Sequence, residues 1–194
     1  MLKQGTNNEA EIAQLIADCR QNNRKAQHRL FKLYYGKVLA ICMRYAKSNE
    51  EAEDMLNEGF LKLFTNLEKY TTTEKGSFNA WLKRVVVNAI IDYQRKYNTL
   101  INTAPLEAIP TMEMEHYDEN SALSKLSTDE LLGMVQQLPP MARSVFNLYI
   151  FENYSHTEIA QLLNIKEGTS HWHLNYARTK LKSMIYENTQ NYGK

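Results

Sequence analysis

The sequence predicts an all-α protein with two helical domains joined by an acidic linker, the second domain a helix-turn-helix. Apolar residues recur at three- and four-residue spacing through most of the 194 residues. No stretch competes with this pattern by alternating apolar and polar residues as a half-buried strand would. The segment 99–128 lacks the periodicity, contains Pro105 and Pro110 and is rich in acidic residues, which is typical of a linker.

The predicted first domain, residues 10–98, contains four helices, each indicated by apolar side chains at helical spacing. They are expected at 9–19, from about 25 to 45, at 50–66 and at 78–96. A polar stretch rich in turn-forming residues, 70–77, separates the third helix from the fourth.

The predicted second domain, residues 129–187, begins where helical patterning resumes. Pro140 suits the first turn of a helix at about 141–151, because the missing N–H would have no partner there. Ser155 and Glu158 have the spacing of a capping box, and Asn164 ends the short helix that follows. A turn of about four residues and a long amphipathic helix complete the pattern of a helix-turn-helix, whose second helix enters the DNA major groove.

The long final helix carries an aliphatic stripe that we expect to be buried, formed by Ser170, Leu174, Ala177 and Leu181. At ~100° per residue, Trp172 and Tyr176 then point nearly the opposite way. Large aromatics on an outer face favour a groove of DNA over water, so we predict that both contact DNA.

Two outer faces of the first domain also indicate binding. On the third helix, burial of Leu56, Phe60 and Phe64 leaves an acidic and amide face outside. On the fourth, the residues expected to be buried are Phe78, Leu82, Val85, Ala89 and Tyr93. The residues expected outside are Arg84, Asn88 and Arg95, bordered by Trp81 and Asp92, with Val87 and Ile91 also outward. Basic groups, an amide and an aromatic beside a polar loop can hold a single strand of nucleic acid.

Composition and charge exclude several classes of protein. The net charge is +5 over 1–98 (16 basic, 11 acidic), −6 over 99–135 (one basic, seven acidic) and +2 over 136–194 (six basic, four acidic), which favours polyanion binding by the two ends.

His171 and His173 diverge by ~200° on a helix and cannot chelate one metal ion together. No set of residues has the spacing of a catalytic site, so we expect neither an enzyme nor a cofactor.

The sequence also indicates where in the cell the protein is expected to act. No window approaches the ~18 apolar residues of a membrane span, and the N-terminus lacks the apolar core of a secretory signal. The two cysteines, Cys19 and Cys42, show no metal or disulfide pattern. We therefore expect a cytoplasmic protein with no direct membrane insertion.

Two groups of motifs together resemble the extracytoplasmic-function (ECF) sigma factors of bacterial RNA polymerase, in the sigma-70 family. Glu51-Ala-Glu-Asp54-Met-Leu-Asn57-Glu58-Gly-Phe60, followed by Phe78-Asn-Ala-Trp81-Leu, Asn88 and Asp92-Tyr-Gln-Arg95, resembles their first domain. Leu138-Pro-Pro-Met-Ala-Arg143, followed by Tyr154-Ser-His-Thr-Glu158-Ile159-Ala160 and Glu167-Gly168-Thr169, resembles their second domain.

The resemblance implies a dissociable polymerase subunit that selects and opens promoters, with core RNA polymerase and promoter DNA as partners. The family often uses an anti-sigma factor, which is a further expected partner. The expected polymerase-binding residues are Asp54, Asn57, Glu58 and Leu61. Those expected at the −10 strand are Tyr70, Lys75, Trp81, Arg84, Asn88 and Arg95. Those expected at the −35 element are Thr169, Ser170, His171, Trp172, His173, Asn175, Tyr176, Arg178 and Lys182.

The sequence departs from the family pattern at both sites. Asn57 stands where the family usually has Gln, which keeps the amide but shortens its reach. His171, His173 and Tyr176 stand at positions that are commonly basic, and Trp172 at one that is commonly small, which weakens the phosphate contribution to binding. The alternative interpretation is a stand-alone helix-turn-helix regulator, in which the first domain would sense a ligand or dimerise.

Overall fold

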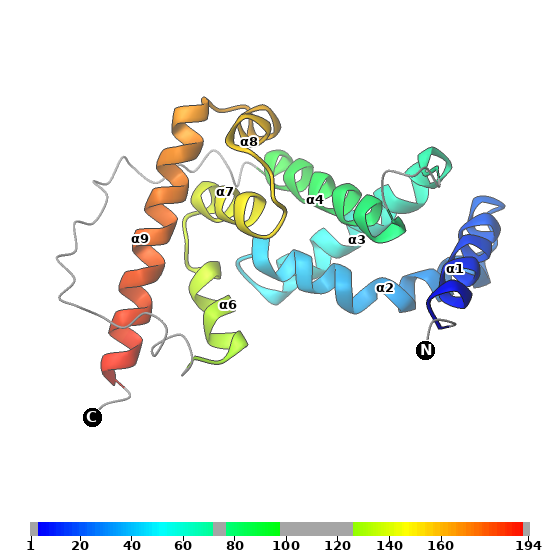
Figure 1. The fold of residues 1–194 in the computed structure, drawn as a ribbon, viewed down its shortest axis with the longest axis horizontal. Coiled ribbons are helices and arrows are strands. Elements are labelled where there is room, and N and C mark those ends of the chain that lie inside the picture. The colour runs from blue at the N-terminus through cyan, green and yellow to red at the C-terminus, as the bar shows by residue number, and fades with distance from the viewer. Residues whose placement is uncertain (1–3, 72–76, 98–125, 192–194) are drawn as a thin grey trace. The chain divides into compact units, whose positions relative to one another are not determined.

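The computed structural model describes residues 4–71, 77–97 and 126–191, and every regular element in these ranges is helical (Figure 1). The first helices are α1 (Gln4–Arg20), α2 (Arg24–Tyr45), α3 (Asn49–Asn66), the short 3-10 helix η1 (Leu67–Lys69) and α4 (Phe78–Lys96). Those that follow are α6 (Thr128–Gln136), α7 (Pro140–Ile150), α8 (His156–Leu163) and α9 (Glu167–Asn191). The predicted all-α class is confirmed. Most of the predicted linker, 98–125, lies outside the described residues.

The ends of the helices follow local chemistry. At the start of α8 the Ser155 side chain accepts a hydrogen bond from the Glu158 N–H, while the Glu158 carboxylate accepts from the Ser155 N–H at 2.8 Å. This is the predicted capping box. Asn164, with φ of 55°, ends α8 in the left-handed conformation. Pro140 occupies the first turn of α7, as its missing N–H favours. A second capping box, at Ser127, starts α6.

The chain divides into two compact units, and the division cuts across two helices. The first unit comprises residues 1–42 and 49–93, and the second comprises 43–48 and 94–194. The last turn of α2 and the end of α4 therefore belong to the second unit.

The core of the first unit forms where α2, α3 and α4 pack together. Each helix contributes side chains with no exposed surface, among them Leu30 and Val38, Met55 and Leu63, and Leu82 and Ile90. The absence of a side chain at Gly59 lets α3 approach its neighbours, because a Cβ there would contact Val86 at 3.6 Å and Val38 at 3.9 Å.

Helix α4 is buried over a wider arc than the sequence predicted. Val87 and Ile91, expected outside, have no exposed surface, and neither does Ile90 beside them. Val85, expected inside, is only half-buried. Consecutive buried positions point in directions ~100° apart, so α4 is covered on more than one side. A single-stripe interpretation could not anticipate this.

The core of the second unit forms where α9 packs against α6, α7 and α8. Leu138, Ala142, Tyr176 and Ala177 form its buried cluster, and Phe146, Trp172 and Leu181 pack against it. The predicted outward orientation of Trp172 and Tyr176 is therefore wrong. Tyr176 is only 6% exposed and stacks on the half-buried Trp172 with ring centroids 5.4 Å apart.

The last turn of α2 is capped by side chains from α4, α6 and α7. The last carbonyls of a helix have no partner within it, so they need donors from elsewhere. Four consecutive carbonyls have one here: Met43 O accepts from Gln136 Nε2 at 2.9 Å, Arg44 O from Asn147 Nδ2 at 2.8 Å, Tyr45 O from Gln94 Nε2 at 3.4 Å and Ala46 O from Arg143 Nη1 at 3.1 Å.

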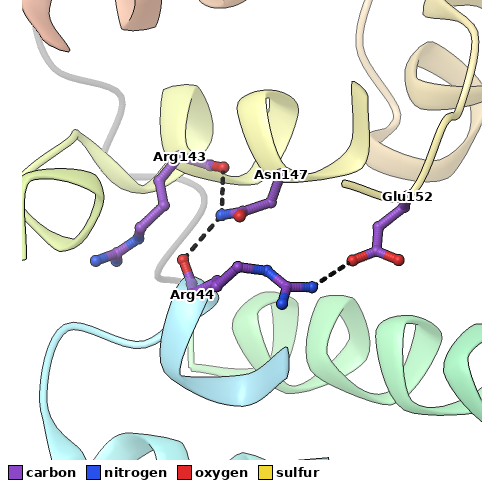
Figure 2. Close-up of polar contacts among 4 residues, drawn as sticks. All are labelled: Arg44, Arg143, Asn147 and Glu152. Carbon is purple, nitrogen blue, oxygen red and sulfur yellow. Dashed lines mark hydrogen bonds and ion pairs between the residues drawn. The ribbon is translucent and has the colours of Figure 1, made fainter. Parts of the chain in front are cut away.

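An ion pair joins the same turn of α2 to the segment that follows α7 (Figure 2). Arg44 Nη2 lies 2.7 Å from Glu152 Oε1, and the Glu152 side chain is 1% exposed. The Arg44 guanidinium also lies 4.7 Å from the centre of the Phe151 ring. Asn147 connects the ion pair to Arg143, since its side-chain amide donates to the Arg44 and Arg143 carbonyls. These polar contacts are part of the interior of the second unit.

Candidate nucleic-acid interfaces

The outer face of α3 lies as predicted. Asp54, Asn57 and Leu61 are exposed and Glu58 is half-buried, while Phe60 on the opposite side has 4% exposed surface. Leu61 is 59% exposed beside these acidic side chains. Tyr93 of α4 donates a 3.3 Å hydrogen bond to Asp54 and thereby restricts its carboxylate. The face thus combines acidic groups, an amide and an apolar side chain.

A groove of about 350 Å³ lies between the end of α3 and α4. Of the predicted −10 residues, Trp81, Arg84 and Asn88 line it together. The end of α3 and η1 add Lys62, Asn66 and Lys69, which sequence reasoning missed as part of this site. Their spacing of four and three residues places them on one helical face, so this signal was present in the sequence. Lys62 forms an exposed ion pair of 3.8 Å with Asp92 of α4.

Tyr70 does not lie on the surface where the prediction placed it. Its side chain is 7% exposed and packs edge-on against Phe78 and tilted against Trp81, with ring centroids 5.2 Å away in each case. Arg20 of α1 donates to the Leu67 and Tyr70 carbonyls and holds the chain there. The Tyr70 ring therefore packs against the Trp81 ring and restricts its position. Lys75 lies outside the described residues.

Arg95 is not among the residues that line the groove. It belongs to the second unit, where its guanidinium donates to the carbonyl of Leu162 in α8. Of the predicted stripe of Arg84, Asn88 and Arg95, only the first two residues line the groove.

The exposed stripe of α9 is polar and narrow. Its members are His171, Asn175, Arg178 and Lys182, all predicted −35 residues. Of the other predicted residues, Thr169 and Trp172 are half-buried, and Ser170, His173 and Tyr176 are buried. Burial lowers the pKa of His173, so this ring is a neutral part of the interior.

The error in the phase of α9 has a physical cause. The prediction assumed that this helix buries only its aliphatic stripe, against a single neighbouring helix. Because α9 packs against three helices, the buried arc extends beyond that stripe and takes in the aromatics. The stripe of His171, Asn175, Arg178 and Lys182 is the narrow arc that remains outside.

A hollow opens beside this stripe. It is lined by Tyr149 of α7, His156 of α8 and His171, Trp172, Leu174, Asn175 and Arg178 of α9. Tyr149 and His156 were not predicted here, because only the packing of α7 and α8 against α9 brings these two side chains beside it.

Neither a metal site nor a membrane span is found in the part of the chain that the structure describes. No group of three or more His, Cys, Asp or Glu side chains in it could hold a metal ion. No described helix is both long enough and apolar enough to cross a bilayer.

Two family models match the chain, one over the helices α2 to α4 and the other over the helices α6 to α9. Sigma-70 region 2 matches residues 30–99, which contain most of α2 together with α3 and α4. Sigma-70 region 4 matches residues 128–181, which contain α6, α7, α8 and most of α9. The chain belongs to the sigma-70 family. It is an RNA polymerase sigma factor that directs promoter recognition.

Relatives of this sigma factor carry the ECF designation. The ECF RNA polymerase sigma factor SigW of Bacillus subtilis is 25% identical over 185 residues, which cover 91% of this chain and 98% of that protein. The ECF RNA polymerase sigma factor SigL of Mycobacterium tuberculosis is 29% identical over 169 residues, covering 84% and 92%. The chain resembles these proteins over nearly their whole length.

A solved structure shares the fold. The sigma factor RpoE from Bartonella quintana, crystallised with the anti-sigma factor NepR, matches with a TM-score of 0.50 and 15% identity. The match covers 82% of this chain and 96% of that one.

Proposed function

We propose that this sigma factor uses three separate surfaces for three targets. The outer face of α3 binds core RNA polymerase, the groove between α3 and α4 binds the melted −10 strand, and the exposed stripe of α9 binds the −35 element. The observation that carries the proposal is that each surface combines exposed polar or basic groups on a helix whose opposite side is buried in a core.

The groove suits an unstacked single strand. Arg84, Lys62 and Lys69 supply positive charge for phosphates, and Asn88 supplies an amide for a base edge. Trp81 supplies an aromatic face, and stacking of a base on such a face contributes about 1–3 kcal/mol. The ring is held in place by Tyr70 and by Phe78, whose centroid lies 5.7 Å away.

The stripe of α9 suits the edge of a duplex. Asn175 can pair with an adenine edge, and His171 and Arg178 can donate to acceptor atoms of bases or phosphates. Lys182, one turn further along, is suited to a phosphate. Tyr176 is buried and not part of this surface, and Trp172 is half-buried and lines the hollow beside it. The fully exposed groups of the recognition helix are therefore polar.

The outer face of α3 suits a protein partner. Desolvation of Leu61 gives such an interface an apolar contact, and Asp54 and Glu58 supply charges that orient it. An anti-sigma factor that covers this face would compete with polymerase. Both partners would be met in the cytoplasm, where this protein acts as an initiation factor and not as an enzyme.

The test is reconstitution with core RNA polymerase, followed by transcription of a genomic library to identify promoters. Asp54→Lys with Glu58→Lys should abolish binding to core enzyme and lower the melting temperature little, since Asp54 is exposed and Glu58 is half-buried at the surface, where charge pairs contribute only about 0–1 kcal/mol. Glu11→Lys on α1 is the matched control, because Glu11 is also exposed. Retained binding in the double variant would refute the assignment of α3.

Two further variants separate the DNA surfaces. Asn88→Ala should reduce opening of duplex promoters much more than initiation on templates with a pre-melted −10 region. Asn175→Ala should weaken promoters according to their −35 sequence, by about 1–3 kcal/mol for a lost base contact. Gln137→Ala, at the exposed end of α6, is the control and should change neither.

A further inference from the structure

Two histidines from different helices stack on each other beside the exposed stripe of α9. The ring centroids of His156 and His171 are 3.6 Å apart and their planes meet at 27°. Tyr149 of α7 also stacks on His156, at 4.7 Å. The Arg178 guanidinium lies 5.7 Å from the centre of the Tyr149 ring. Three helices thus bring two imidazoles and one permanent cation into one hollow.

The groups that face the pair define its charge. His156 Nδ1 lies 2.8 Å from the hydroxyl of the buried Ser170. His171 Nε2 lies 3.9 Å from the carboxylate of Glu167, which also accepts a 3.1 Å hydrogen bond from Thr157. The charged and titratable neighbours are therefore Tyr149 from α7 together with Glu167 and Arg178 from α9.

In the free protein these surroundings favour an uncharged His156. Burial, the ring of His171 and the Arg178 guanidinium lower the pKa of His156 below its ordinary value, and Glu167 opposes them. Two charged rings at 3.6 Å would repel each other, which is how His171 lowers the pKa of His156.

A DNA phosphate would reverse this preference. In a helix-turn-helix the first helix crosses the DNA backbone, and His156 is the first residue of α8, which is that helix. A negative charge within a few ångströms stabilises a protonated imidazole. Protonation of His156 also needs no rearrangement, because the Ser170 hydroxyl can donate to a neutral Nδ1 or accept from a protonated one. The Nε2–H is then available to donate to a phosphate oxygen.

We propose that the His156–His171 pair, together with Arg178, binds one backbone phosphate of the −35 DNA and takes up one proton as it binds. This proposal rests on the −35 role of α9 proposed above and adds a proton to it. Promoter binding by this sigma factor would then respond to the pH of the cell.

The sign of the effect follows from linkage. At a pH below the pKa of His156 in the free protein, the proton is already bound and affinity does not vary with pH. Between that value and the raised value in the complex, affinity falls as pH rises. Uptake of one proton limits the fall to about tenfold per pH unit. At higher pH the affinity is again constant, at a weaker level.

The experiment measures binding of the full-length chain to two duplexes of about 25 base pairs. One carries the −35 region of a promoter that the holoenzyme transcribes, and the other carries the same bases scrambled. Affinity is measured at constant ionic strength from about pH 5.5 to about pH 8, the range in which histidine titrates. Calorimetry in two buffers of different ionisation enthalpy counts the protons taken up.

The wild-type chain should bind both duplexes more weakly as pH rises, with uptake approaching one proton. His156→Gln should remove the dependence and bind at all pH values as weakly as wild type does at high pH. His156→Arg, with a permanent charge, should bind without pH dependence and more tightly than His156→Gln. His28→Gln is the control, because His28 is exposed on α2 in the first unit, and it should keep the wild-type profile.

Other outcomes would overturn the proposal in distinguishable ways. A flat wild-type profile with intact binding, or an unchanged slope in His156→Gln, would refute the proton-linked contact and leave the −35 role standing. A slope on the −35 duplex alone would show that the pair contacts a base edge and not a phosphate. Failure of the wild-type chain to bind either duplex would refute the −35 role itself.

Discussion

Replacement of Tyr176 by alanine should unfold the second unit rather than impair DNA reading alone. The ring is 6% exposed, contacts the cluster of Leu138 and Ala142, and stacks on Trp172. A buried aromatic side chain removes roughly 150–250 Å² from water. At about 25 cal/mol per Å², that burial contributes about 4–6 kcal/mol as an upper bound.

Measured truncations of buried aromatics cost about 3–5 kcal/mol, so we expect a loss of about 4 kcal/mol. This is comparable to the whole stability of a small domain. The melting transition of the second unit should fall by roughly 15 °C or more, because each kcal/mol shifts a domain of this size by about 4–8 °C.

The assay is thermal unfolding of the full chain by calorimetry and circular dichroism, with transcription measured in parallel. Tyr176→Phe keeps the ring and should cost less than about 1.5 kcal/mol, as volume-conserving changes do. Asn175→Ala, at the neighbouring exposed position, should leave the melting transition in place and impair promoters through their −35 sequence. If Tyr176→Ala melts like wild type but loses −35-dependent transcription, the ring contacts DNA and our assignment of the α9 faces is wrong.

Three further predictions concern stability and domain organisation. Arg44→Met should destabilise the second unit by about 3 kcal/mol in urea unfolding, because it leaves the carboxylate of Glu152, 1% exposed, without its cation. The double variant with Glu152→Gln should cost clearly less than the sum of the single variants, and additive costs would show that the pair is not coupled. Gly36→Ala should raise stability by about 1 kcal/mol in calorimetry, because Gly36 is exposed within α2 and an added Cβ meets no atom within 4 Å; unchanged or lower stability would contradict this. Limited proteolysis should cut first within 99–128 and leave two folded fragments, 10–98 and 129–187, whereas first cuts within 50–96 would contradict this division.

The elements that local chemistry determines were predictable from the sequence. The Ser155 capping box, the left-handed Asn164 and Pro140 at a helix start each act within a few residues, so a short stretch of sequence contains the whole cause. The outer face of α3 was also predictable, because its buried stripe packs on one side only.

The features that the sequence did not predict depend on how several helices pack together. The buried arc of α9 results from three packed helices, and no hydropathy pattern of one helix states how many neighbours it has. The stack of His156 on His171 depends on the turn between α8 and α9, since the residues are fifteen positions apart. Arg95 illustrates the same limit, because its position on the outer stripe of α4 did not reveal that it donates to the Leu162 carbonyl.

The capped end of α2 has a consequence for the order in which the chain folds during its synthesis on the ribosome. The donors Gln136, Arg143 and Asn147 follow their acceptor carbonyls by 93, 97 and 103 residues. Since synthesis proceeds from the N-terminus at about 5–20 residues per second, the last turn of α2 waits roughly 5–20 seconds for the groups that complete it. During that interval we expect the carbonyls of Met43, Arg44 and Ala46 to be solvated and the turn to fray, although Gln94, 49 residues after Tyr45, is synthesised earlier. A nascent chain stalled before Gln136 should therefore show rapid amide exchange at the end of α2, and one stalled well beyond Asn147 should not.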